Sequence, residues 1–207
     1  MIRNIIFDMG NVLIYFDPKT FLTRVGIEDP ADRELLLREV YRSLEWAQMD
    51  RGSLTDAEAG QIMMKRVPEH LKKKVYELVC EWDRPILPVP GMAELVKELK
   101  ENGYRIYLLS NASYHQHDYW QQIPGWEYFD GTLISADEKL VKPQPEIYAL
   151  TCERFGLRPE ENLFVDDAVG NAEGAVFSGW NAIVFHDDVA ELRRKMQAMG
   201  VKVNSAN

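Results

Sequence analysis

The sequence predicts an α/β protein whose parallel, doubly wound sheet carries an inserted helical domain. Short apolar runs alternate with helix-like segments over most of the chain, which indicates repeated strand–helix units. Residues 17–84 are the exception, because they show helical patterns and no strand signal. We therefore expect a core made of residues 1–16 and 85–207, with residues 17–84 inserted as an α-helical cap over the carboxyl edge of the sheet.

The first predicted strand spans residues 5–7, an apolar run typical of a strand that is buried on both faces. The run stops at Asp8, and a turn at Gly10 follows. Open α/β sheets bind their ligands at the carboxyl ends of their strands. Asp8 is therefore a candidate functional residue, although an acid at this point also suits an ordinary turn.

Helix signals fill the inserted segment. Residues 17–18 (Asp-Pro) are typical of an N-cap and a first helical position. Apolar side chains at residues 36, 40 and 44 recur at helical spacing. Thr55 and Glu58 predict a capping box at the start of another helix. The proline-rich stretch 85–90 is stiff and non-helical, and it ends the segment.

Helices and strands alternate after Gly91. We expect strands over residues 104–109, 132–134, 162–165 and 182–185, and helices over residues 93–100, 146–155 and the stretch that includes Tyr119 and Trp120. These units complete the parallel sheet of the core.

Composition narrows the class of protein. Hydrophobic residues make up 46% of the chain and charged residues 28%, as in ordinary globular proteins. The net charge of −9 argues against nucleic acid and anionic membranes as partners. No apolar stretch reaches membrane-spanning length, and Asp8 interrupts the N-terminal apolar run too early for a signal peptide. Cys80 and Cys152 lack metal-binding spacing and are expected to be buried, reduced thiols of a cytoplasmic protein.

Polar residues end several of the predicted strands. Asp8 ends the first, residues 110–111 (Ser-Asn) follow the second, residues 166–167 (Asp-Asp) follow a later one, and Lys142 lies in a loop between them. Each signal alone is common in turns and helix caps. Because the carboxyl ends of parallel strands lie on one edge of the sheet, we expect these side chains to converge there.

The converging residues suit phosphoryl transfer. Three carboxylates would repel a phosphate dianion, but one Mg²⁺ and the Lys142 ammonium would neutralise them. Carboxylate, carbonyl and water oxygens are ligands that Mg²⁺ prefers. A hydroxyl such as that of Ser110 can donate to phosphate oxygens, and a carboxylate can attack phosphorus to form an aspartyl-phosphate.

These residues resemble the four motifs of the haloacid dehalogenase (HAD) superfamily, over nearly the whole chain. Residues 8–12 (Asp-Met-Gly-Asn-Val) match the first motif and Ser110 matches the second. Lys142 matches the third, and residues 166–167 match the fourth. The resemblance implies a Rossmann-like core, and the helical insertion resembles the small α-helical cap of the family.

The resemblance also implies roles for the metal site. Asp8 would be the nucleophile and a Mg²⁺ ligand. Asp167 would be a direct ligand, and Asp166 would act through a water molecule. The backbone carbonyl of Gly10 would be a further ligand. Ser110, Asn111 and Lys142 would then bind the phosphoryl group, with Lys142 also steadying Asp8.

One residue departs from the family pattern. Gly10 stands where the family has a second aspartate, which acts as general acid and base, and losing such a group typically costs about 10²–10⁴ in rate. The first motif of this chain is similar to that of bacterial sugar-phosphate phosphatases, including α-glucose-1-phosphate phosphatase. Asp17, His115 and His117 are alternative proton donors, although Asp17 already suits a helix cap and the histidines an exposed helix.

Further residues have two interpretations each. The turn from Trp46 to Gly52 can reach over the site, where Trp46 and Arg51 would contact a sugar. Equally, Trp46 can pack inside the cap. Asn171 can orient the metal ligands, or it can face solvent.

The sequence thus predicts a cytoplasmic, Mg²⁺-dependent phosphatase of a small phosphorylated metabolite, with a sugar phosphate as the first candidate. One alternative is a catalytically degenerate protein that binds a phosphorylated ligand or partner. Another is a dehalogenase-type hydrolase, against which the retained acidic pair argues. The sequence predicts no nucleic-acid or membrane partner and leaves the oligomeric state open.

Overall fold

A computed structural model describes residues 1–204. Five parallel strands form one sheet in the order β3-β2-β1-β4-β5. The strands are β1 (Asn4–Phe7), β2 (Arg105–Ser110), β3 (Gly131–Ile134), β4 (Asn162–Asp166) and β5 (Asn181–Val184). Each predicted strand is present with bounds that differ by about one residue. The fold is the predicted α/β, Rossmann-like one.

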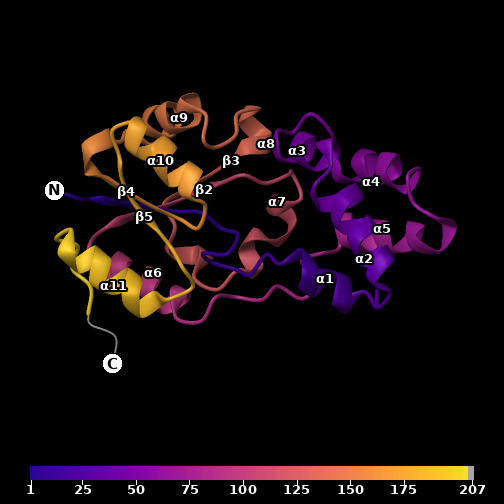
Figure 1. Cartoon of the computed structure of the whole chain (residues 1–207). Coiled ribbons are helices and arrows are strands. Elements are labelled where there is room, and N and C mark those ends of the chain that lie inside the picture. The colour runs from indigo at the N-terminus through magenta and orange to yellow at the C-terminus, as the bar shows by residue number, and fades with distance from the viewer. Residues whose placement is uncertain (205–207) are drawn as a thin grey trace.

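Helices surround this sheet and extend from one end of it (Figure 1). Those of the N-terminal half are α1 (Pro18–Arg24), α2 (Pro30–Leu36), α3 (Leu44–Asp50), α4 (Asp56–Met64) and α5 (Lys72–Cys80). Those of the C-terminal half are α6 (Met92–Glu101), α7 (Gln116–Tyr119), α8 (Ser135–Glu138), α9 (Pro145–Phe155), α10 (Val169–Phe177) and α11 (Val189–Ala198). Figure 1 shows α6 and α11 on one face of the sheet, and α9 and α10 on the other.

Alternation along the strands builds two apolar layers. In β1, Ile5 and Phe7 belong to one buried cluster, whereas Ile6 belongs to the other. The first cluster takes in residues of α6 and α11, and the second those of α9 and α10. Because successive strand side chains point to opposite faces, a strand covered on both sides is apolar throughout. This explains the uninterrupted apolar runs of the sequence.

The five helices α1–α5 lie together beyond the carboxyl edge of the sheet (Figure 1). Asp17 caps α1 by accepting hydrogen bonds from the main-chain N–H groups of Lys19 and Thr20. The capping box of Thr55 and Glu58 opens α4. Both cap predictions are confirmed. We propose residues 17–84 as the cap domain, although the buried apolar cluster runs without a break from these helices into the sheet.

The predicted helical repeat at residues 36, 40 and 44 is wrong at its last position. Helix α2 ends at Leu36, a π-helical turn covers Leu37–Tyr41, and a new helix begins at Leu44. The Ser43 hydroxyl accepts a hydrogen bond from the Trp46 N–H, which starts α3 in a new direction and leaves Leu44 70% exposed. Within residues 1–204, no helix is both long and apolar enough to cross a membrane.

Candidate active site

The end of β1 places Asp8 at the centre of the sheet's carboxyl edge. The Asp8 main-chain N–H still donates to the Val165 carbonyl, at 2.8 Å, so the ladder with β4 extends to this residue. The chain then turns through Asn11, whose φ of 54° is a left-handed conformation that asparagine tolerates. The Asn11 side chain accepts from the Phe16 N–H and donates to Asp167, which ties the turn to the loop after β4.

Strand register brings the other acids to Asp8. Phe7 pairs with Leu108 of β2 on one side and with Val165 of β4 on the other. The strands therefore end together, and carboxylate oxygens of Asp8, Asp166 and Asp167 lie within 4.8 Å of one another. The predicted convergence of these three acids is what the structure shows.

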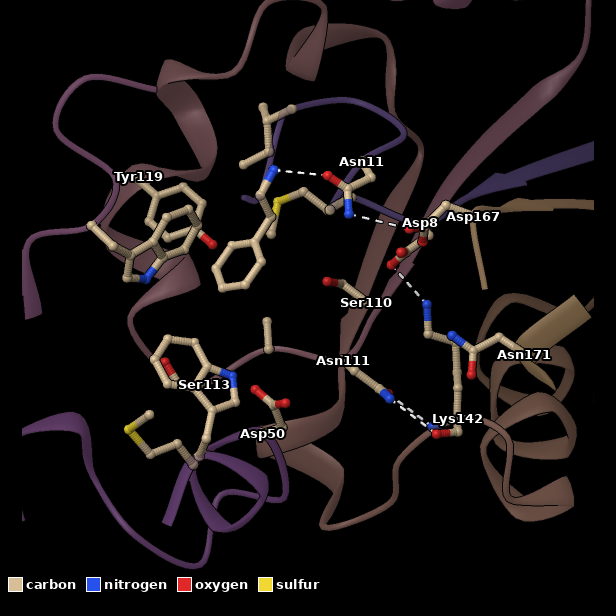
Figure 2. Close-up of a pocket in the computed structure, with 18 of the residues that line it drawn as sticks. Asp8, Asn11, Asp50, Ser110, Asn111, Ser113, Tyr119, Lys142, Asp167 and Asn171 are labelled. Atoms are coloured by element: carbon tan, nitrogen blue, oxygen red, sulfur yellow. Dashed lines mark hydrogen bonds and ion pairs between the residues drawn. The ribbon is translucent and has the colours of Figure 1, made fainter. Parts of the chain in front are cut away.

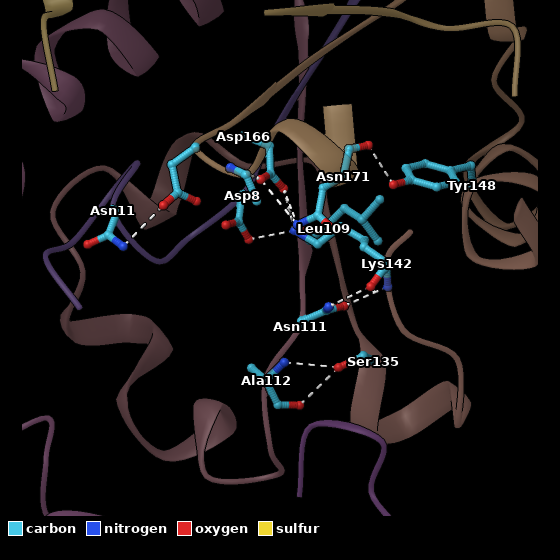
Figure 3. Close-up of polar contacts among 12 residues, drawn as sticks. Asp8, Asn11, Leu109, Asn111, Ala112, Ser135, Lys142, Tyr148, Asp166 and Asn171 are labelled. Carbon is cyan, nitrogen blue, oxygen red and sulfur yellow. Dashed lines mark hydrogen bonds and ion pairs between the residues drawn. The ribbon is translucent and has the colours of Figure 1, made fainter. Parts of the chain in front are cut away.

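Lys142 is inserted between two of the acids. Its Nζ lies 2.7 Å from Asp8 Oδ1 and 2.8 Å from Asp166 Oδ2, and it donates to the Leu109 carbonyl at 2.9 Å (Figure 3). Its side chain is fully buried. Both polar atoms of the Asn111 side chain bind the main chain of Lys142, at 2.8 and 3.0 Å. Asn111 therefore positions the lysine loop, and its direct contact with a substrate stays a prediction.

The two acids after β4 have different surroundings. Asp166 is fully buried and accepts hydrogen bonds from Lys142, the Ala168 N–H and the Asn171 side chain. Asp167 is half-buried, and its carboxylate accepts a hydrogen bond from the Asn11 side chain. Asp167 thus has oxygen lone pairs left for another partner, whereas Asp166 is largely engaged. Of the two interpretations of Asn171, the structure therefore supports the one in which it orients an acid of the cluster, and not the one in which it faces solvent.

Burial and charge shift the acid–base behaviour of this cluster. Burial, together with repulsion from Asp166, raises the pKa of Asp8 to about 7. Attraction by Lys142 lowers this pKa but offsets only part of the increase. Burial also raises the pKa of Asp167. For Lys142, burial lowers the pKa, but Asp8 and Asp166 outweigh it and the pKa is raised. The lysine stays charged, and Asp8 and Asp167 resist ionisation without further positive charge.

The donor set fits a hard divalent cation. Three carboxylates and one ammonium carry a net charge of −2 when all are ionised, which one divalent cation neutralises. All three acids offer hard oxygen ligands, and no cysteine or histidine belongs to the cluster. An acidic group that could bind a metal is therefore present where the sequence predicts it.

A cavity of about 200 Å³ opens between this cluster and the helices α3 and α4 (Figure 2). Asp8, Ser110 and Lys142 line its base. Its walls combine aromatic and acidic side chains, namely Phe16, Trp46, Trp82, Tyr119, Asp50 and Asp56. Among the residues that line it, Lys142 is the sole lysine or arginine. A ligand bound here would meet apolar walls and acids, with one cation at the base.

The three alternative proton donors lie outside this cavity. Asp17 caps α1 through both carboxylate oxygens. His115 contacts Asp83 at 2.9 Å and Asp118 at 3.1 Å. The exposed His117 contacts Asp137. None of the three lines the cavity in which the carboxylates meet.

The stretch from Trp46 to Gly52 does reach the site, where Trp46 lines the cavity and Arg51 does not. Arg51 points to the core, where it donates to the Lys139 carbonyl and to Gln144. Trp46 packs 4.9 Å from the Tyr41 ring centroid and also borders the cavity. Asp50, the last residue of α3, and Asp56, the first residue of α4, are acids that also face the cavity, and Asp56 accepts a hydrogen bond of 2.7 Å from Ser113.

Sequence reasoning missed Asn11, Asp50, Asp56 and Ser113. Asp50 lies within residues 46–52, the stretch that the sequence predicts to reach over the site, so this prediction could have pointed to it. Nothing in the sequence pairs Asp56 with Ser113, since 57 positions separate them.

The fold and the cluster define the class: an open α/β protein with a carboxylate–lysine site at the carboxyl edge of its sheet. The sequence profile of haloacid dehalogenase-like hydrolases matches residues 2–179. The chain therefore belongs to the haloacid dehalogenase-like hydrolases, and the predicted superfamily is confirmed.

Individual relatives include phosphatases. A sesquiterpene phosphatase of Aspergillus oryzae is 26% identical over 199 residues, which cover 94% of this chain and 95% of that protein. A phosphorylated carbohydrates phosphatase of Thermotoga maritima is 25% identical over 182 residues, which cover 84% and 81%. The chain is thus a HAD-like hydrolase with phosphatases among its relatives.

A solved structure shows the same fold. A HAD family enzyme of Bacteroides thetaiotaomicron, in complex with magnesium and inorganic phosphate, superposes with a TM-score of 0.71 at 23% identity. The match covers 93% of this chain and 99% of that one. The resemblance to α-glucose-1-phosphate phosphatase in particular stays a prediction.

Proposed function

We propose that this protein is a Mg²⁺-dependent phosphomonoester hydrolase that acts on a small phosphorylated metabolite through an aspartyl-phosphate on Asp8. The observation that carries this proposal is the position of Lys142, buried between Asp8 and Asp166 at 2.7 and 2.8 Å. A buried ammonium in that position keeps one oxygen of Asp8 fixed and leaves the other for attack. The phosphatases among its relatives support the same activity.

Each residue of the cluster has a role in this proposal. Asp8, Asp167 and the Gly10 carbonyl would ligate Mg²⁺ directly, and Asp166 would do so through a water molecule. The bound metal would supply positive charge against the negative charge of the phosphoryl group. Lys142 and the Ser110 hydroxyl would hold phosphoryl oxygens and stabilise the charge that develops on them.

The chemical step then proceeds in two stages. An oxygen of Asp8 attacks phosphorus, and the bond from phosphorus to the substrate's alcohol oxygen breaks. Water next attacks phosphorus, which releases inorganic phosphate and restores the Asp8 carboxylate. Burial of the cluster excludes bulk water from the first stage, so the charged groups act in a low-dielectric setting.

A sugar phosphate is the first candidate for the substrate. The cavity of about 200 Å³ suits a molecule of metabolite size. Its aromatic walls can stack on the apolar face of a sugar. A second anionic group on the substrate would find no further lysine or arginine in the lining. A cytoplasmic setting, in which such metabolites occur, is part of this proposal.

Phosphate release is the test. Purified protein is incubated with p-nitrophenyl phosphate, glucose 1-phosphate, glucose 6-phosphate and 2-phosphoglycolate, each with Mg²⁺ or with EDTA. We expect Mg²⁺-dependent phosphate release. The kcat/KM should be higher for the two glucose phosphates, whose sugar part is uncharged, than for 2-phosphoglycolate, which carries a second anionic group. Metal-dependent binding of phosphate without any turnover would instead support a degenerate binding protein. Chloride release from 2-chloropropionate that EDTA leaves unchanged would support a dehalogenase.

A further inference from the structure

Asp50 brings a carboxyl group into the cavity from the cap side. It is the last residue of α3, and Figure 2 shows its carboxylate turned into the cavity that Asp8 and Ser110 also line. Among residues 1–204, no side chain or main-chain group donates a hydrogen bond to this carboxylate or forms an ion pair with it. Asp50 is half-buried and its carboxyl faces the cavity, so a ligand bound there can supply the missing hydrogen-bond partner.

Hydrogen bonds hold the main chain around Asp50 in place, whereas none holds its carboxyl group. The Ser135 hydroxyl donates to the Asp50 carbonyl at 2.5 Å. The next residue, Arg51, donates to the core through the Lys139 carbonyl and Gln144, both at 3.2 Å. These contacts hold the end of α3 against the edge of the sheet. The position of the Asp50 carboxyl over the site is therefore set by the fold.

The surroundings of Asp50 favour its protonated form near neutral pH. Burial raises the pKa of Asp50 to about 7, and repulsion by Asp56 and by Asp8 adds to this effect. Lys142 lowers the pKa and offsets only part of it. A group that exchanges its proton close to neutral pH is well matched to general acid–base catalysis.

Other ionisable side chains of the cavity suit this role less well. Asp56 already accepts a hydrogen bond from the Ser113 hydroxyl. Burial raises the pKa of Tyr119 well above its usual value, so its hydroxyl is a poor proton donor. Asp17, His115 and His117 lie outside the cavity, and Gly10 has no carboxyl.

We propose that Asp50 donates the proton that the substrate's alcohol oxygen takes up, the task that Gly10 cannot perform. The inference rests on the proposed phosphatase activity. As the bond from Asp8 to phosphorus forms and the bond from phosphorus to the alcohol oxygen breaks, the protonated Asp50 gives its proton to that oxygen. The Asp50 carboxylate then removes a proton from the water that attacks phosphorus, which returns Asp50 to its starting form.

The test compares leaving groups that differ in their need for a proton. The kcat for glucose 6-phosphate, an alkyl phosphate, is divided by the kcat for p-nitrophenyl phosphate, whose phenolate leaves with little protonation. We expect Asp50→Asn to lower this ratio by about 10²-fold or more. The native protein should also lose kcat on the alkyl substrate as pH rises through the Asp50 titration, and the variant should lack that decline. Asp50→Glu should recover part of the ratio.

A matched control is Asp56→Asn, which removes a second acid from the same wall. We expect it to leave the ratio within a few-fold and to move the alkaline decline to lower pH, because it relieves repulsion on Asp50. A ratio unchanged in Asp50→Asn, or lowered equally in Asp56→Asn, overturns the role of Asp50 while the phosphatase stands. A native protein without Mg²⁺-dependent turnover of p-nitrophenyl phosphate overturns the proposed function and this inference together.

Discussion

The amide of Asn171 donates to both carboxylate oxygens of Asp166, each at 3.1 Å. Asn171 belongs to the first turn of α10, and its own carbonyl accepts a hydrogen bond of 2.7 Å from the Tyr148 hydroxyl (Figure 3). Helix α10 is thereby fastened to α9 on one side and to the acidic cluster on the other. The bidentate contact fixes the orientation of an acid that also binds Lys142.

Removing this contact should weaken metal binding. We expect Asn171→Ala to lower Mg²⁺ affinity by about 10–100-fold, because groups that orient the ligands of a metal typically contribute that much. Isothermal titration calorimetry of the metal-free protein measures the effect. Asn102→Ala is the matched control, since its amide donates to the Lys202 carbonyl on an exposed surface. Equal affinities in the two variants would contradict the orienting role of Asn171.

Metal affinity should depend on pH below neutrality. The pKa of Asp8 in the metal-free protein is about 7, so below this pH the carboxyl must lose a proton before it can bind a cation. The apparent Kd for Mg²⁺ should fall about tenfold for each pH unit from pH 5 to 7, and it should level off above. The Asp8→Asn variant has no carboxyl to titrate at this position. The slope of log Kd against pH should therefore be smaller by about one decade per pH unit than in the native protein. A native Kd that is constant from pH 5 to 8 would disprove this linkage.

The loop that follows Asp50 should tolerate no side chain at Gly52. Its φ of 69° is left-handed, and an added Cβ would lie 2.2 Å from the Ala136 carbonyl oxygen of the core. We expect Gly52→Ala to displace the loop, to destabilise the protein by about 1–3 kcal/mol beyond backbone strain alone, and to lower kcat. Urea unfolding and steady-state kinetics measure the two effects.

Gly26 provides the control for this substitution. Its φ of 77° is similarly left-handed, but an added Cβ would meet no atom within 4 Å. Gly26→Ala should therefore show the backbone strain, about 1 kcal/mol, with kcat retained. If the two variants lost equal stability and activity, the close approach at Ala136 would have no role in placing the loop.

The part of the site on the sheet was predictable because strand periodicity is local. An apolar run that stops at Asp8, at Ser110 or at Asp166 fixes each residue at a strand end, and parallel pairing then brings the ends together. The metal-type cluster follows from these local patterns and from the topology they imply.

The part on the cap was not predictable in the same way. Asp50 reaches the cavity because α3 begins afresh at Ser43 and because Gly52 allows a close approach to Ala136. The contacts made by Ser43 and Gly52 leave no periodic signal in the chain.

Helix α10 of the core also departs from the usual amphipathic pattern. Its large apolar residue Phe177 is 88% exposed, whereas the small residues Ala172 and Ala175 are buried.

Detection of a phosphoryl group on Asp8 tests the proposed aspartyl-phosphate directly. The protein is mixed with Mg²⁺ and substrate, quenched in acid within the first turnover, and digested for peptide mass spectrometry. We expect a phosphoryl adduct on the peptide that contains Asp8, and we expect both the adduct and turnover to be lost in Asp8→Asn. Full phosphate release by Asp8→Asn, with no adduct in the native protein, would contradict the proposed aspartyl-phosphate.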